Sequence, residues 1–168
     1  MNKASNGFTL IELIIYIGIV AGVLLVVLNF GWEIIYGDVK SQTIREVQQN
    51  MRFSMEKINE SILGAKTISS PPFGSSSDSL SLTMQDLNLD PTIFEVINNK
   101  LTITQGGDGP YELTNDRVRV DNLNFTNVSY EGAPGAIRVQ ITLEHVNPNN
   151  LKQYEASLEA ETTISLRR

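Results

Sequence analysis

The feature that most constrains this chain is an uninterrupted apolar run near its start. Leu13 to Trp32 is a stretch of 20 residues without a formal charge. At about 1.5 Å per residue, a helix of this length spans about 30 Å, which is the thickness of the hydrocarbon core of a bilayer. A lone strand would leave its backbone groups unpaired in lipid. The run therefore predicts a transmembrane helix over about residues 8–32.

The charges on either side of the run predict its orientation. Lys3 precedes the run, and Glu33 and Asp38 are the first charges after it. The tendency of basic residues to stay inside then places the N-terminus in the cytoplasm and the rest of the chain outside. A secretory signal peptide is the competing interpretation, but its apolar stretch is about 7–15 residues long and ends at a small-residue cleavage site. This run is longer, and no clean site of that kind follows it.

Glu12 is the one charged residue between Phe8 and Trp32. A carboxylate on the lipid-buried first turn of a membrane helix costs about 2–3 kcal/mol or more when it has no partner. One interpretation places Glu12 at the headgroup boundary, where the helix dipole favours an anion. The other is that the carboxylate has a specific partner.

The residues around Glu12 resemble a known N-terminus. Gly7-Phe8-Thr9-Leu10-Ile11-Glu12, followed by a long apolar helix, is similar to the start of type IV pilins and type II secretion pseudopilins, over roughly the first 30 residues. The resemblance implies that a prepilin peptidase cleaves between Gly7 and Phe8, and that the new amino group of Phe8 is N-methylated. It also implies that Glu12 pairs with the Phe8 amine of a neighbouring subunit in a filament. Such a pair would fix the register of assembly, because breaking a buried ion pair costs about 3–5 kcal/mol.

Gly18 and Gly22 form a Gly-x-x-x-Gly sequence within the apolar run. This spacing lets membrane helices approach one another closely. The two glycines therefore have either a specific role in helix packing or no role beyond being tolerated there.

The chain stays helical in pattern beyond the membrane run. Apolar or small residues recur every three or four positions, which places them on one face of a helix. They are Ile44, Val47, Met51, Met55, Ile58, Ile62 and Ala65. This stripe favours packing against a sheet over a coiled-coil seam. The helix is predicted to end near Gly64–Lys66, and Gly31 and Gly37 are predicted bend points.

After a loop expected over Ser69–Ser79, the period of the pattern changes to two, which is typical of strands. Ile93–Thr104 reads as a β-hairpin around Asn98-Asn99, with Gly106–Pro110 as the next turn. Ile137 to Leu143 and Tyr154 to Leu166 read as two long closing strands. The predicted fold class is α+β, a long N-terminal helix packed on an antiparallel β-sheet domain. The predicted parts are a leader (1–7), the helix (8–66, with a transmembrane half and an amphipathic half) and an extracytoplasmic β domain (67–168).

This order of elements also resembles the pilin architecture. The finer pattern is most similar to J-type minor pseudopilins and W-type minor pilins. It comprises Arg52, the helix end at Ala65-Lys66, the central hairpin, Tyr111-x-Leu113-Thr114 before a strand with Phe125, and the two closing strands.

The composition offers little for catalysis or metal binding. The chain has no Cys and a single His, His145, which is interpreted as a surface residue. Gly106-Gly107-Asp108-Gly109 lacks the alternating oxygen ligands of a calcium loop, so a simple turn is favoured. The net charge of −6 argues against binding nucleic acid. We therefore expect no enzymatic activity, no cofactor and no metal.

The expected function is that of a structural subunit, more in keeping with a minor one, of a type IV pilus or a type II secretion pseudopilus. The resemblance implies as partners the prepilin peptidase, other subunits contacted through the N-terminal helix, and the inner-membrane assembly platform. Lipid would surround the helix before assembly, in a single-pass protein of the cytoplasmic membrane. Two alternatives stay open: an adhesive or DNA-uptake tip pilin on the same scaffold, and a membrane-tethered binding domain of unrelated function.

Overall fold

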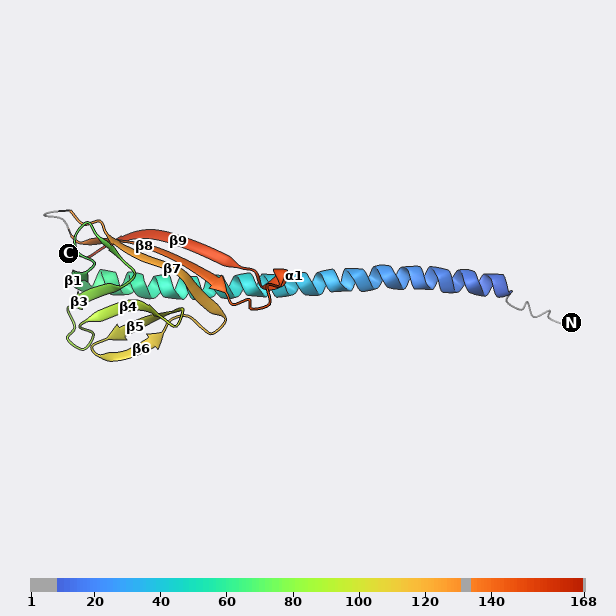
Figure 1. Ribbon diagram of the computed structural model, residues 1–168, viewed down its shortest axis with the longest axis horizontal. Coiled ribbons are helices and arrows are strands. Elements are labelled where there is room, and N and C mark those ends of the chain that lie inside the picture. The colour runs from blue at the N-terminus through green and yellow to red at the C-terminus, as the bar shows by residue number, and fades with distance from the viewer. Residues whose placement is uncertain (1–8, 131–133, 168) are drawn as a thin grey trace. The chain divides into compact units, whose positions relative to one another are not determined.

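The computed structural model describes residues 9–130 and 134–167. Within them the chain forms one long helix followed by strands in two antiparallel sheets, so the predicted α+β class is confirmed (Figure 1). The elements are α1 (Leu10–Gly64), β1 (Ala65–Ser70), β2 (Ser76–Ser77), β3 (Leu80–Met84), β4 (Thr92–Ile97), β5 (Lys100–Gln105), β6 (Asp108–Glu112), β7 (Val118–Asn127), β8 (Ala136–His145), the 3-10 helix η1 (Lys152–Tyr154) and β9 (Ser157–Ser165). The predicted leader and Phe8 lie outside the described residues.

The chain divides into two compact units between Val39 and Lys40. The first unit holds the apolar half of α1. The second, from Lys40 onward, holds the rest of α1 with both sheets and is called the body below. The hydrogen-bonded helix continues through Gly31 and Gly37, whose role as bend points stays a prediction.

The first unit exposes its apolar side chains. Every large apolar residue from Leu10 to Tyr36 is between 51% and 76% exposed. This part of α1 is long and apolar enough to cross a membrane. A surface of this kind is not stable in water without a cover, because burying apolar area is the main favourable term in folding and association.

The body contains two sheets, where the sequence led us to expect one. The first sheet has the strand order β1-β3-β4-β5-β6, and the second has the order β2-β7-β8-β9. The segment Ser69–Ser79, predicted as a loop, holds the end of β1 and the two-residue strand β2. The segment Gly106–Pro110, predicted as a turn, already includes the start of β6. β2 is short and polar and pairs with the distant strand β7, so its sequence carries no strand signal of its own, whereas β6 pairs with the preceding strand β5 across a tight turn.

The hairpin predicted around Asn98-Asn99 is confirmed. β4 and β5 pair in continuous register from Thr92 with Gln105 to Ile97 with Lys100. The two asparagines have φ values of 53° and 63°. Positive φ at both central residues is the requirement of a type I′ turn, which asparagine tolerates better than most residues do.

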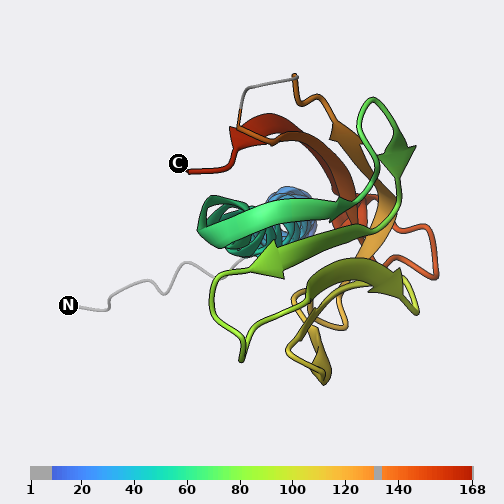
Figure 2. The ribbon, with the colours of Figure 1, turned by 90° about the vertical axis from the view of Figure 1, so that its left-hand side faces the viewer.

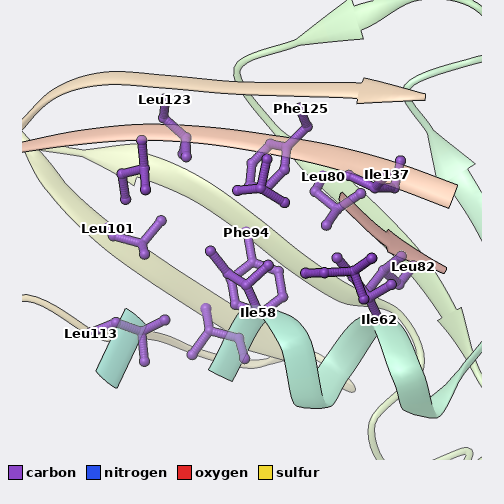
Figure 3. Close-up of a cluster of buried hydrophobic side chains, with 14 of the residues drawn as sticks. Ile58, Ile62, Leu80, Leu82, Phe94, Leu101, Leu113, Leu123, Phe125 and Ile137 are labelled. Carbon is purple, nitrogen blue, oxygen red and sulfur yellow. The ribbon is translucent and has the colours of Figure 1, made fainter. Parts of the chain in front are cut away.

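The core of the body lies between the helix stripe and the two sheets (Figures 2 and 3). Ile58 and Ile62 of α1 are fully buried, together with Phe94 from the first sheet and Phe125 from the second. The alternation predicted along β8 is confirmed, since Ile137, Val139, Ile141 and Leu143 are all 0% exposed. The stripe therefore packs on sheets as predicted, except that Ile44 stays 39% exposed.

Candidate functional site

The N-terminal end of α1 is closed by a side chain that sequence reasoning missed. The Thr9 hydroxyl accepts a hydrogen bond from the backbone N–H of Glu12 at 3.3 Å, and the Thr9 carbonyl accepts one from the N–H of Leu13 at 3.2 Å. Thr9 is thus the N-cap residue of the helix, and it satisfies a donor that the helix start leaves free. The sequence signal was present, because Thr-x-x-Glu is the pattern of a capping box.

Glu12 lies on the first turn of α1 and is exposed. Within the part of the chain that the structure describes, its carboxylate makes no hydrogen bond or ion pair. The site therefore offers an exposed carboxylate at the capped start of a long apolar helix. This arrangement suits a cationic partner supplied from outside the described residues, because an anion in apolar surroundings needs a counter-charge.

Gly18 and Gly22 have open surroundings. A Cβ atom added at either position would meet nothing within 4 Å in the described chain. No contact within the chain therefore requires a glycine at these places. Their predicted role in helix packing stays a prediction.

The polar and aromatic side chains at the far end of the apolar run are arranged as a membrane boundary would need. Asn29 donates its side-chain N–H to the carbonyl of Leu25 at 2.8 Å, so its amide is partly satisfied by its own helix. The rings of Trp32 and Tyr36 lie one turn apart, with centroids 6.4 Å from each other. Tryptophan and tyrosine are enriched at headgroup depth, where a polar tip and an apolar body are both satisfied.

A second polar site lies in the body, where the second half of α1 begins. Glu46 of α1 accepts a hydrogen bond from the side-chain amide of Asn115 at 3.1 Å. Its Oε2 atom also lies 3.5 Å from Nη1 of Arg117 and 3.7 Å from Nε2 of His145. Asn50, one turn further along α1, accepts a hydrogen bond from the backbone N–H of Asn115 at 3.0 Å. We call these five residues the Glu46 cluster.

The loop that carries Asn115 and Arg117 is also held from its other side. Lys100 of β5 pairs with Asp116 and, at 2.6 Å, with Glu112. The hydrogen bond between Lys100 and Asp116 raises the pKa of Lys100 and lowers the pKa of Asp116. Because the carboxyl pKa is lowered on folding, the contact stabilises the fold at pH values above the pKa that Asp116 has in the unfolded chain. The stabilisation is therefore present at neutral pH and is lost as the pH falls through the folded pKa of Asp116.

The interpretation of His145 as a surface residue is wrong. Its side chain is 9% exposed, and its ring stacks on Tyr154 with centroids 5.8 Å apart and an angle of 13° between the planes. Its Nδ1 is buried and has no hydrogen-bond partner among the residues that the structure describes. The sequence could not show this. Glu46 lies about 100 residues before His145 in the chain, and Tyr154 comes after the turn that follows β8.

The Glu46 cluster ties separate elements of the body together. Across residues 9–130 and 134–167, no three His, Cys, Asp or Glu residues are grouped as a metal site would require. The cluster joins α1 to the loop before β7 and to the end of β8, so it fixes the helix in the body.

Replacing Glu46 with alanine should lower the free energy of unfolding of the body by about 1–3 kcal/mol, because it removes the carboxylate that accepts a hydrogen bond from Asn115 and lies beside Arg117 and His145. Glu56→Ala is the matched control, since Glu56 is an exposed residue of the same helix and its loss should cost about 0.5 kcal/mol or less. Urea-dependent protection of the body from a protease measures both. Equal midpoints for the two variants would show that the cluster does not stabilise the body.

Comparison with models of protein families, with curated proteins and with solved structures finds no match to this chain. The geometry itself is that of a pilin-like architecture: one long N-terminal helix, apolar at its start, whose later part packs on antiparallel sheets. Gly7 and Phe8, the residues expected to be processed, lie outside the described part of the chain.

Proposed function

We propose that this protein is a structural subunit, and a minor one, of a type IV pilus or a type II secretion pseudopilus. One observation carries the proposal. A single exposed carboxylate, Glu12, stands on the first turn of a helix whose apolar side chains are all exposed for more than six turns. In the sequence this turn follows Gly7-Phe8 after one residue, the capping Thr9.

Under this proposal the exposed apolar half of α1 is shielded from water by two different partners, one before assembly and one after it. In the unassembled subunit the cover is lipid, because the run matches the thickness of the hydrocarbon core and ends at Trp32 and Tyr36. In the filament the cover is the corresponding helix of other subunits. A heterologous, head-to-tail contact of this kind generates an open fibre.

Glu12 directs the transition between the two states. Cleavage between Gly7 and Phe8 by a prepilin peptidase creates an amino group, N-methylated at Phe8, that lies four residues before Glu12. The carboxylate of one subunit and the amine of the next then neutralise each other in apolar surroundings. Under this proposal the subunit meets its neighbours at the assembly platform of the inner membrane. The proposal assigns no enzymatic activity to the chain.

Mass spectrometry of the protein extracted from membranes tests the proposal. We expect the mature chain to begin at Phe8 and to carry a methyl group on its amine. An intact Met1, or a cut beyond residue 30, would contradict it, because the first outcome excludes the peptidase and the second indicates a secretory signal.

An adhesive tip pilin on the same scaffold is the second candidate. A groove of about 530 Å³ in the body is lined by Lys66, Arg167 and Phe73, among others. Phe73 is 65% exposed. Exposed aromatic and cationic groups suit ligand binding, but two cations on a chain of net charge −6 do not make a surface for nucleic acid.

A further inference from the structure

The loop between β8 and β9, residues 146–156, is held in one shape by side chains; we call it the collar loop. Asn147 donates its amide to the carbonyl of Leu151 at 2.9 Å and accepts a hydrogen bond from the N–H of Leu151 at 2.9 Å. Tyr154 stacks on His145, the residue just before the loop. Such a loop needs no ordering before it binds, which lowers the entropic cost of an interaction.

The collar loop is tied to the first residue of the body. The ammonium group of Lys40 donates hydrogen bonds to the backbone carbonyls of Lys152, at 3.1 Å, and of Glu155. The loop therefore lies beside the point at which the chain enters the body from the apolar half of α1. This placement depends only on contacts within the body.

The collar loop exposes apolar, aromatic and cationic groups. Val146 is 39% exposed, Leu151 is 41% exposed and Tyr154 is 37% exposed. Lys152 is exposed beside them, and Glu155 is the acidic residue of the same loop. Short apolar side chains flanked by tyrosine and lysine suit the interface of a bilayer, where apolar atoms reach the acyl boundary and the polar tips stay among the headgroups.

The length of the chain places this surface near the membrane. Lys40 follows Trp32 by eight residues, all of them helical. Eight helical residues rise about 12 Å, and the headgroup layer on each side of the hydrocarbon core is about 5–8 Å thick. Along the helix, Lys40 therefore lies about 4–7 Å beyond the headgroup layer, a gap that the side chains of a loop bound to Lys40 are long enough to cross.

We propose that the collar loop rests on the lipid headgroups in the unassembled subunit, with Leu151 and Tyr154 at the interface. This inference rests on the membrane anchorage that the proposed function assumes. The partner is a lipid surface. A protein partner would have to be recruited, whereas lipid is already present at this distance from the end of the apolar run.

The absence of Cys from the sequence makes the test direct, because each introduced cysteine is the only thiol. Leu151→Cys and Val146→Cys, each in the full chain, are labelled with bimane. They are then placed in nanodiscs of phosphatidylethanolamine and phosphatidylglycerol that carry a nitroxide on part of the headgroups. Phe73→Cys is the matched control: Phe73 is also exposed, and it follows the other end of α1, which lies about 36 Å along the helix from Lys40. Trp32, the only tryptophan, reports whether the helix is inserted.

We expect the nitroxide lipids to quench Trp32 and the labels at positions 146 and 151, and to leave the label at position 73 bright. If Trp32 is quenched while positions 146 and 151 are no dimmer than position 73, the collar loop does not meet the membrane, although the anchorage stands. If Trp32 is not quenched, the anchorage itself is wrong and this inference fails with it. The N-terminal mass of the chain tests the pilin-like processing separately.

Discussion

A chain in which Glu12 is replaced by alanine should be cleaved between Gly7 and Phe8 as the native chain is, yet should fail to enter the filament. The peptidase acts before Glu12 has met a neighbour, so processing does not need the carboxylate. In the filament, the neighbour's Phe8 amine would be left as a buried charge without a partner. Removing one member of a buried pair costs about 3–5 kcal/mol, which lowers the equilibrium constant for adding a subunit by about two to four orders of magnitude.

Two further variants show whether this effect comes from the charge of Glu12. Glu33→Ala is the matched control, because Glu33 is also exposed on the first unit's part of α1, and this variant should assemble normally. Glu12→Gln separates two physical roles. A glutamine can serve at the third position of a helix capped by Thr9, but it cannot neutralise an amine.

The measurement is the amount of each variant in sheared filaments relative to the amount of cleaved chain in membranes. If Glu12→Gln assembles as well as the native chain, Glu12 acts through the helix start. If Glu12→Ala also assembles normally, Glu12 has no part in the mechanism.

Truncating Phe125 to alanine should lower the free energy of unfolding of the body more than any other change considered for it. Phe125 of β7 is 0% exposed and belongs to the core that joins α1 to both sheets (Figure 3). Replacing a buried phenylalanine with alanine costs about 3–5 kcal/mol, because the lost burial and the remaining cavity add up. This is a large share of the stability of a typical domain, which is about 5–15 kcal/mol.

Phe73→Ala is the matched control for this substitution. Phe73 is 65% exposed, so the same change of side chain there should alter the free energy of unfolding by about 0.5 kcal/mol or less. Pulse proteolysis in urea is the suitable measurement, since the only tryptophan, Trp32, lies outside the body and its fluorescence does not report on the core. Equal midpoints for the two variants would show that Phe125 is not part of a tightly packed core.

The elements that could be predicted from the sequence are those whose signal is local. The stripe through Val47, Met51, Ile58 and Ile62 repeats at the helical period, and these residues are buried against sheets. The alternation along β8 likewise predicted a strand with one buried face. In each case the period of the apolar residues is set by the geometry of the element itself.

The features that escaped prediction depend on contacts between distant segments. β2 is two residues long and exists because Ser76 and Ser77 pair with Thr126 and Phe125 of β7. The division into two sheets follows from pairings of this kind, which a single sequence does not reveal. The same is true of Glu46, whose partner Asn115 is 69 residues away.

The candidate site was predictable to the extent that it is a sequence motif. Glu12 was singled out because a lone charge in an apolar run is costly, and the helix that carries it begins one residue after Thr9. Thr9 itself was missed, although the capping pattern was visible. The attachment of the collar loop to Lys40 had no sequence signal, because Lys40 and Lys152 are 112 residues apart.

The second half of α1 supplies one wall of the core of the body, and this limits where the chain can be divided. A fragment that began at Ala65 would keep every strand but would lose Val47, Met51, Ile58 and Ile62, and so would expose the inner faces of both sheets to water. A soluble fragment, or a recombination that exchanges heads between chains of this kind, therefore has to start no later than Lys40. In natural recombination as in protein engineering, the strands can be exchanged only together with the part of the helix on which they fold.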